Sequence, residues 1–298
     1  MQTITTLKQQ KNAMILAHLY QDLSVQAIAD VVGDSFEMAR RAAESAADVL
    51  VICGVEFMAE SAKLLSPDKT VLLPRSDAGC IMADMITPED VMALRQQHPD
   101  AAVMCYVNTT AAVKAVCDVS CTSSSAVKIA KRLDAQKIIF VPDKNLGGYV
   151  AAQVPEKEFI FFDGCCPIHD DVSLDRIATV RTRHPNAAVI VHPECKPEVA
   201  AAADFVGSTS QIIDRVMNGS EDTFIIGTEV TIAELLRERL PDKKIYTLSS
   251  MMVCSNMRKT TVDDVVHALE KGIHEITLDA DVMDKAKITL ERMIELGA

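Results

Sequence analysis

Chemically similar residues recur along this chain at intervals of nearly ninety residues. Three strand-like runs, AMILAHLY, AVMCYVN and AVIVHPE, carry polar residues in matching positions, 88 and 86 residues apart. Further sets of equivalent positions, here called columns, recur with the same spacings. Several independent columns in one register indicate three homologous units. The repeated positions are His18, Tyr106 and His192; Tyr20, Asn108 and Glu194; Asp30, Asp118 and Asp204; and Pro67, Pro155 and Pro241.

Short apolar runs alternate with longer amphipathic stretches in every unit, a pattern typical of βαβ units and parallel sheets. We predict an α/β fold of three homologous three-layer αβα domains, with small parallel sheets around a pseudo-threefold axis. The expected boundaries are 1–82, 83–168 and 169–279, and a C-terminal helix over 280–298 is expected to pack on the first domain. Because ligands bind at the carboxyl ends of parallel strands, the three domains should share one central cavity.

Composition narrows the possible partners. The 298 residues carry a net charge of −12 and no Lys/Arg-rich run, which argues against nucleic acid and anionic membranes. The N-terminus shows no signal-peptide pattern, and no apolar run approaches the roughly 18 residues of a membrane span. Nine cysteines in such a chain suggest buried thiols, catalysis or metal in a reducing compartment. We expect a cytoplasmic protein that acts on small molecules.

One cysteine column differs from the rest. Cys80, Cys166 and Cys254 each follow the last strand of their unit, 86 and 88 residues apart. Four of the other cysteines are explained by small size or burial, and Cys165 and Cys195 have no thiol counterparts in the other units. Three thiolates that converge at the axis favour an iron–sulfur cluster, whose open iron could act as a Lewis acid. A Cys₃ zinc site with an open position, as in hydrolases, is the alternative.

The polar strand ends suggest acid–base chemistry. Glu194, beside His192, is the predicted general base, because partial burial can raise a carboxyl pKa toward the working pH. Tyr20 and Tyr106 can donate hydrogen bonds to developing oxyanions.

Ser and Thr residues follow the second strand of each unit, at Gly33-Asp34-Ser35, at residues 121–125 and at residues 207–210. They are suitable N-caps for the helices that come next. Three helix N-termini at one cavity would also bind carboxylates and phosphate. The chain has neither GxxxxGK[ST] nor GxGxxG, so a bound nucleoside triphosphate or dinucleotide is not supported.

The segments ILAHLY, IADVVGDS, DKNLGGYVA, CCPIH, HPEC and CSNM, with the three cysteines, resemble the quinolinate synthase family over essentially the whole chain. The resemblance implies one [4Fe–4S] cluster on Cys80, Cys166 and Cys254, used as a Lewis acid and not as a redox relay. It also implies condensation of iminoaspartate with dihydroxyacetone phosphate to quinolinate, in NAD biosynthesis. The partners are then these small molecules, with functional coupling to an iminoaspartate-producing enzyme.

The resemblance also suggests roles for individual residues. It implies that His18 and Tyr20 contact the substrate and transfer protons, and that Tyr106 and Asn108 hold oxygens of the intermediate. Ser35 and Ser123 would bind carboxylates, and Ser208 and Thr209 the phosphate. His169, His192 and Glu194 would line the reacting centre.

The sequence departs from the family pattern at four positions: Leu19, Gly79, Ile81 and Arg258. Two other functions stay open at this stage, a zinc-dependent hydrolase and a non-catalytic binding protein for small organic anions.

Overall fold

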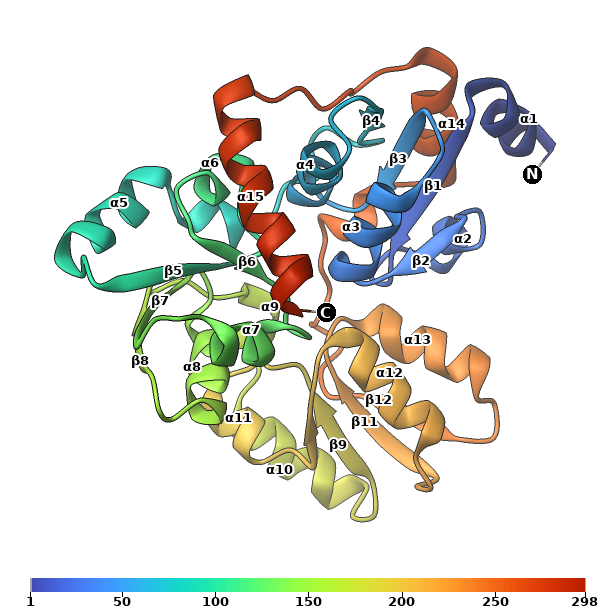
Figure 1. The fold of residues 1–298 in the computed structure, drawn as a ribbon. Helices are drawn as coiled ribbons and strands as arrows, with labels where there is room; N and C mark the ends of the chain where they lie inside the picture. The colour runs from blue at the N-terminus through green and yellow to red at the C-terminus, as the bar shows by residue number, and fades with distance from the viewer. Residues whose placement is uncertain (1, 298) are drawn as a thin grey trace.

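The computed structural model describes residues 2–297, which form three α/β units around a common centre (Figure 1). Each unit has one four-stranded parallel sheet flanked by helices. The strand order is the same in all three sheets, with the first strand between the second and the third, and the fourth at the edge. The predicted α/β fold of three αβα domains with small parallel sheets is confirmed.

The elements follow the same sequence in each unit. The first contains α1 (Gln2–Lys11), β1 (Ala13–His18), α2 (Leu23–Gln26), β2 (Val31–Gly33), α3 (Ser35–Glu44), β3 (Val49–Cys53), α4 (Glu56–Leu65) and β4 (Thr70–Leu72). The second contains a 3₁₀ turn (Ala83–Met85), α5 (Pro88–Gln97), β5 (Ala101–Tyr106), α6 (Ala111–Lys114), β6 (Val119–Cys121), α7 (Ala126–Arg132), β7 (Lys137–Val141), α8 (Lys144–Gln153) and β8 (Glu158–Phe161).

The third unit contains α9 (Pro167–Asp170), α10 (Leu174–Arg183), β9 (Ala188–Val191), α11 (Pro197–Ala201), β10 (Phe205–Val206), α12 (Thr209–Asn218), β11 (Thr223–Gly227), α13 (Val230–Arg239) and β12 (Lys244–Thr247). A second 3₁₀ turn (Met257–Lys259), α14 (Val262–Lys271) and α15 (Ala280–Gly297) complete the described chain.

The aspartate column of the sequence has a structural role. In each unit an aspartate just before the second strand accepts a hydrogen bond from a backbone N–H of the first strand, and so fixes the pairing of the two strands. The three bonds are Ile15 N to Asp30 Oδ2 (2.8 Å), Val103 N to Asp118 Oδ2 (2.7 Å) and Val189 N to Asp204 Oδ2 (2.7 Å).

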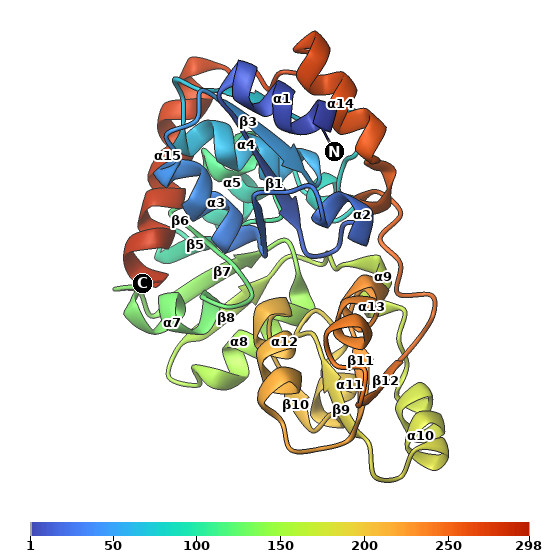
Figure 2. The ribbon, with the colours of Figure 1, turned by 90° about the vertical axis from the view of Figure 1, so that its right-hand side faces the viewer.

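Helix α14 departs from the expected boundary at residue 279. Like α5 and α10, it starts eight residues after one of the three repeated cysteines. Helices α5 and α10 belong to the sheet that follows them, but no fourth sheet follows α14. It packs instead on α1 and β3 of the first unit, and Figure 2 shows it beside α1. The chain thereby closes the ring of three units.

Helix α15 packs on α4 of the first unit, as expected, but it lies mainly against the second unit. Its contacts there are with β6, α6 and α7 (Figure 1). Its buried residues Ala286, Leu290 and Met293 join one apolar core that the first and second units share. The third unit forms two further core clusters, one of which also includes Leu19 of the first unit.

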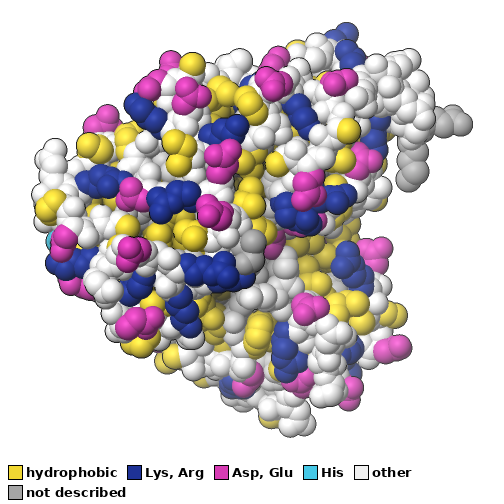
Figure 3. All heavy atoms as spheres, in the orientation of Figure 1, with side chains coloured by type: hydrophobic (Ala, Val, Ile, Leu, Met, Phe, Trp, Pro, Cys, Tyr) yellow, Lys and Arg dark blue, Asp and Glu magenta, His cyan; other side chains and the backbone are white. Residues whose placement is uncertain are grey.

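The surface carries charges of both signs. On the face shown in Figure 3, Lys and Arg side chains alternate with Asp and Glu. No helix within residues 2–297 is long and apolar enough to cross a membrane.

Candidate active site

One cavity lies where the strands of all three units end. Every residue that the sequence predicted for the site lines it, with the single exception of Ser208. The members are His18, Tyr20, Ser35, Cys80, Tyr106, Asn108, Ser123, Cys166, His169, His192, Glu194, Thr209 and Cys254. Residues distant in sequence meet here because the units are arranged around this point.

Two histidines of the strand-end column share one hydrogen-bond pattern. The backbone N–H of Tyr20 donates to Nδ1 of His18 at 3.1 Å, and that of Glu194 donates to Nδ1 of His192 at 3.3 Å. The ring proton of each neutral imidazole must therefore sit on Nε2. Burial lowers the pKa of both histidines to about 4. At neutral pH they are uncharged hydrogen-bond donors.

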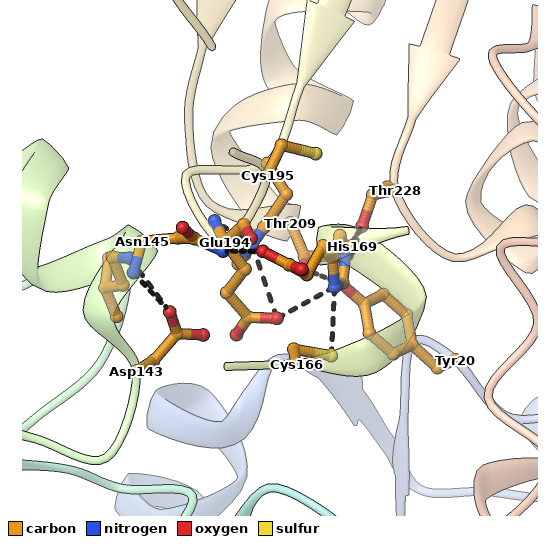
Figure 4. Close-up of polar contacts among 12 residues, drawn as sticks. Tyr20, Asp143, Asn145, Cys166, His169, Glu194, Cys195, Thr209 and Thr228 are labelled. Carbon is orange, nitrogen blue, oxygen red and sulfur yellow. Dashed lines mark hydrogen bonds and ion pairs between the residues drawn. The ribbon is translucent and has the colours of Figure 1, made fainter. Parts of the chain in front are cut away.

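Glu194 is the centre of the polar network (Figure 4). Its Oε1 accepts a 2.6 Å hydrogen bond from the hydroxyl of Tyr106, and its Oε2 lies 2.8 Å from His169 Nδ1 and 3.8 Å from His192 Nδ1. Burial raises the pKa of Glu194, but the two imidazoles and the hydrogen bonds from His169 and Tyr106 outweigh it, so the net shift is downward. The expectation of a raised pKa is wrong, and Glu194 is a stable carboxylate.

A chain of hydrogen bonds joins this carboxylate to the first unit. His169 Nε2 lies 3.0 Å from the hydroxyl of Thr228, which lies 2.8 Å from the hydroxyl of Tyr20, and Tyr20 also contacts Thr209 at 3.0 Å. Burial and the negative charge of Glu194 raise the pKa of Tyr20, so it stays a neutral phenol. Thr228 was not predicted, because its counterparts in the other units, Gly54 and Pro142, have no hydroxyl to mark the column.

The hydroxyls at the helix starts divide into two groups. Ser35 is the first residue of α3 and Thr209 the first of α12, and both line the cavity with Ser123. Ser208 accepts from Gln211 N as the N-cap of α12 and does not line it. Its expected role in direct substrate binding is therefore not supported.

Asn108 has free capacity for a ligand. Its side-chain Oδ1 is buried and has no hydrogen-bond partner in the described chain, although the residue lines the cavity. A buried polar atom without a partner is destabilising. A hydroxyl or amino group of a bound substrate would satisfy it.

Three free thiols, Cys80, Cys166 and Cys254, face the same cavity from three loops. Burial raises the pKa of all three thiols, that of Cys80 to about 12, and the negative charge of Glu194 raises each of them further. Backbone N–H groups of the 3₁₀ turns hydrogen-bond to the sulfurs of Cys80 and Cys254. A soft cationic centre would stabilise three such thiolates, so the donor set fits an iron–sulfur cluster.

A second donor set overlaps the first. Sγ of Cys166, Nδ1 of His169 and a carboxylate oxygen of Glu194 all lie within 4.8 Å of one another, and Figure 4 shows them pointing toward a common point. His169 Nδ1 is 3.2 Å from Cys166 Sγ. Such a mixed set can bind zinc. Both sets need Cys166.

The four departures from the family pattern have clear positions. Leu19 is buried in a core cluster of the third unit, so an apolar side chain suits it. Arg258 contacts Glu229 at 3.4 Å. Gly79 and Ile81 flank Cys80 at the cavity.

Comparison with known proteins gives a consistent result. The family model of the quinolinate synthetase A protein (NadA) matches residues 2–295. Quinolinate synthase of Caldicellulosiruptor saccharolyticus is 52% identical over 294 residues, which cover 99% of this chain and 97% of the relative. The Clostridioides difficile quinolinate synthase is 48% identical with the same coverage. That of Methanoregula boonei is 49% identical over 98% of this chain and 97% of the relative.

Proposed function

The chain belongs to the quinolinate synthetase A family, and we propose that it condenses iminoaspartate with dihydroxyacetone phosphate to form quinolinate. Four carbons and the nitrogen come from iminoaspartate, and three carbons come from the triose. One phosphate and two water molecules leave. Atoms and electrons then balance without an oxidant or a reductant, so the reaction needs Lewis-acid and acid–base chemistry only.

The anionic groups of the substrates match the helix starts. Ser35 at α3 and Ser123 before α7 would hold the carboxylates of iminoaspartate, and Thr209 at α12 the phosphate. Hydroxyls combined with the free N–H groups of a helix N-terminus stabilise anions. These local groups explain how a protein of net charge −12 binds substrates of the same sign.

Hydrogen-bond donors lie around the same volume. His18 and His192 each present Nε2–H, and Tyr20 is a neutral phenol. These donors would hydrogen-bond to the substrate oxygens that leave as water and stabilise the negative charge that develops on them. Glu194 fixes the hydroxyl of Tyr106 and the Nδ1 edge of His169, and its low pKa keeps it an acceptor throughout. We therefore assign it an orienting and electrostatic role in place of a free general base.

Cys80, Cys166 and Cys254 would hold one [4Fe–4S] cluster. When bound, it supplies an open iron site that can polarise a substrate oxygen. Three thiols from three units, with backbone N–H groups aimed at two of them, support this assignment.

The observation that carries the proposal is the single cavity in which matched strand ends from three units meet three free thiols. The test is an anaerobic assay of quinolinate formation from both substrates, with iron, sulfide and zinc analysis. We expect quinolinate, released phosphate and about four iron and four sulfide per chain. Stoichiometric zinc without sulfide would favour the hydrolase that the Cys166–His169–Glu194 set permits. Binding of the triose phosphate without turnover would indicate a binding protein.

A further inference from the structure

Lys114 is a fully buried cation outside the cavity lining. It is the last residue of α6, and its Nζ donates to the backbone carbonyls of Val107, at 2.8 Å, and Thr109. These two carbonyls alternate in the chain with Tyr106 and Asn108, whose side chains line the cavity. The lysine therefore holds the loop that aims both side chains.

The first unit makes the same two bonds with a different side chain. Gln26, the last residue of α2, donates Nε2 to the carbonyls of Leu19 at 3.1 Å and Gln21 at 2.9 Å. Donor and acceptors all lie 88 residues before their counterparts in the second unit. The loop held in this case carries Tyr20. Since an amide and an ammonium group make identical contacts, the position requires a donor to two carbonyls and not a charge.

The third unit has Ala200 at this position, which offers no side-chain donor. Its strand-end loop is held from the neighbouring unit instead, because Nδ2 of Asn145 on α8 donates to the backbone carbonyl of Glu194 at 3.1 Å. The same amide group donates to Asp170 Oδ1 at 2.9 Å. All three loops that end a first strand are thus fixed by a buried side-chain donor.

The environment of Lys114 explains how it is tolerated. Burial lowers the pKa of Lys114, and the negative charge of Glu60 on α4 opposes that shift. The ammonium also lies 5.7 Å from the centre of the Phe57 ring. Glu60 also accepts a 2.9 Å bond from Ala111 N at the start of α6. The first unit therefore supports the helix from which Lys114 reaches the loop.

We propose that Lys114, Gln26 and Asn145 are positioning residues. Each donates hydrogen bonds to backbone carbonyls of a strand-end loop and so fixes the orientation of the catalytic side chains that the loop carries. The inference rests on the proposed function. Displacement of a reacting group by about 1 Å can reduce a rate about 100-fold. Without Lys114, the Tyr106 hydroxyl would lose its fixed place 2.6 Å from Glu194.

The test compares two variants at one site. Lys114→Met keeps the length and apolar packing but removes the donor, whereas Lys114→Gln restores the donor that the first unit uses. We expect kcat for quinolinate to fall at least tenfold in Lys114→Met, with unchanged iron content and with KM for dihydroxyacetone phosphate within threefold. Lys114→Gln should recover to within threefold of the wild type.

A core variant controls for stability. Val150→Ala removes buried side-chain volume on α8, away from the loop, and should lower the melting temperature while leaving kcat unchanged. A kcat within threefold of the wild type in Lys114→Met, or an equal loss in Val150→Ala, would refute the proposal. If Lys114→Met does not fold, Gln26→Met tests the same positioning role in the first unit.

A structural readout separates this proposal from the proposed function. In a crystal structure of Lys114→Met, the Tyr106 hydroxyl should have moved out of hydrogen-bond distance of Glu194, whatever reaction the protein catalyses. An unmoved Tyr106 would overturn the positioning role. Absence of quinolinate with the wild type would overturn only the proposed function.

Discussion

Replacement of Glu194 by Gln tests the polar network at its centre. The wild-type carboxylate accepts hydrogen bonds from Tyr106 at 2.6 Å and from His169 at 2.8 Å. Hydrogen bonds to a charged group contribute about 1.5–3 kcal/mol each. The amide keeps the shape but can accept only through one oxygen, so we expect a loss of about 3–4 kcal/mol. This corresponds to a fall in kcat of about 100- to 1000-fold.

The assay is quinolinate formation under anaerobic conditions, with iron content measured for each sample. Glu198→Gln, an exposed isosteric change on α11 in the same unit, should retain wild-type kcat. A loss of less than tenfold in Glu194→Gln, with the iron intact, would refute the reasoning.

The pH dependence separates an orienting carboxylate from a general base. A carboxyl group with a pKa at or below its ordinary 4.5 is at least about 97% ionised at pH 6, whereas a base tuned to about 6.5 is only about 24% ionised. The ratio of wild-type kcat to that of Glu194→Gln cancels substrate ionisation. We expect the ratio to stay constant between pH 8 and pH 6. A threefold or larger fall would restore the tuned-base assignment.

Three further predictions concern stability and metal. Because the folded pKa of His18 and of His192 is about 4 against 6.5 when unfolded, the unfolded state binds more protons between these values, and the free energy of unfolding falls as pH drops through this window. Each histidine should lower the free energy of unfolding by about 2 kcal/mol at pH 5 relative to pH 7.5. Denaturant titrations at the two pH values should show that His18→Gln removes one such contribution. A variant with the pH dependence of the wild type would contradict this prediction. Cys166→Ala should abolish bound iron while its neighbour variant Cys165→Ala retains it, by metal analysis; equal iron in both would refute the ligand assignment. Asp118→Asn should lower the free energy of unfolding by about 1–2 kcal/mol and leave kcat unchanged, and a matching loss of kcat would show a role beyond strand pairing.

Much of the architecture could be predicted from the repeat. The number of units, their parallel sheets and the meeting of the three cysteines all depend on local patterns that recur in one register, so each copy supports the others. The columns of His18 and Cys80 are visible because chemically similar residues recur in them. Thr228 cannot be recognised as a site residue from the repeat, because its counterparts Gly54 and Pro142 have no side-chain hydroxyl.

The features that the sequence did not predict depend on contacts between residues that are distant in the chain. The place of α14 follows from the absence of a fourth sheet, and α15 fills a core shared by two units; neither follows from local periodicity. The pKa of Glu194 has the same origin. Its burial could be anticipated, but the net direction depends on His169 from the α9 turn and Tyr106 from another unit.

The three strand-end loops show how a symmetric scaffold carries an asymmetric reaction. The backbone is held at equivalent carbonyls in the first two units, by Gln26 and Lys114, while the side chains that it presents differ in every unit. The third loop is held by Asn145 of the second unit, and it is the loop that carries Glu194. The unit with the central carboxylate is thus fixed by its neighbour, so the geometry of the site depends on how the units pack. Core substitutions between the second and third units should therefore lower kcat more than substitutions within α10 that lower the melting temperature equally. Equal effects on kcat would contradict this dependence.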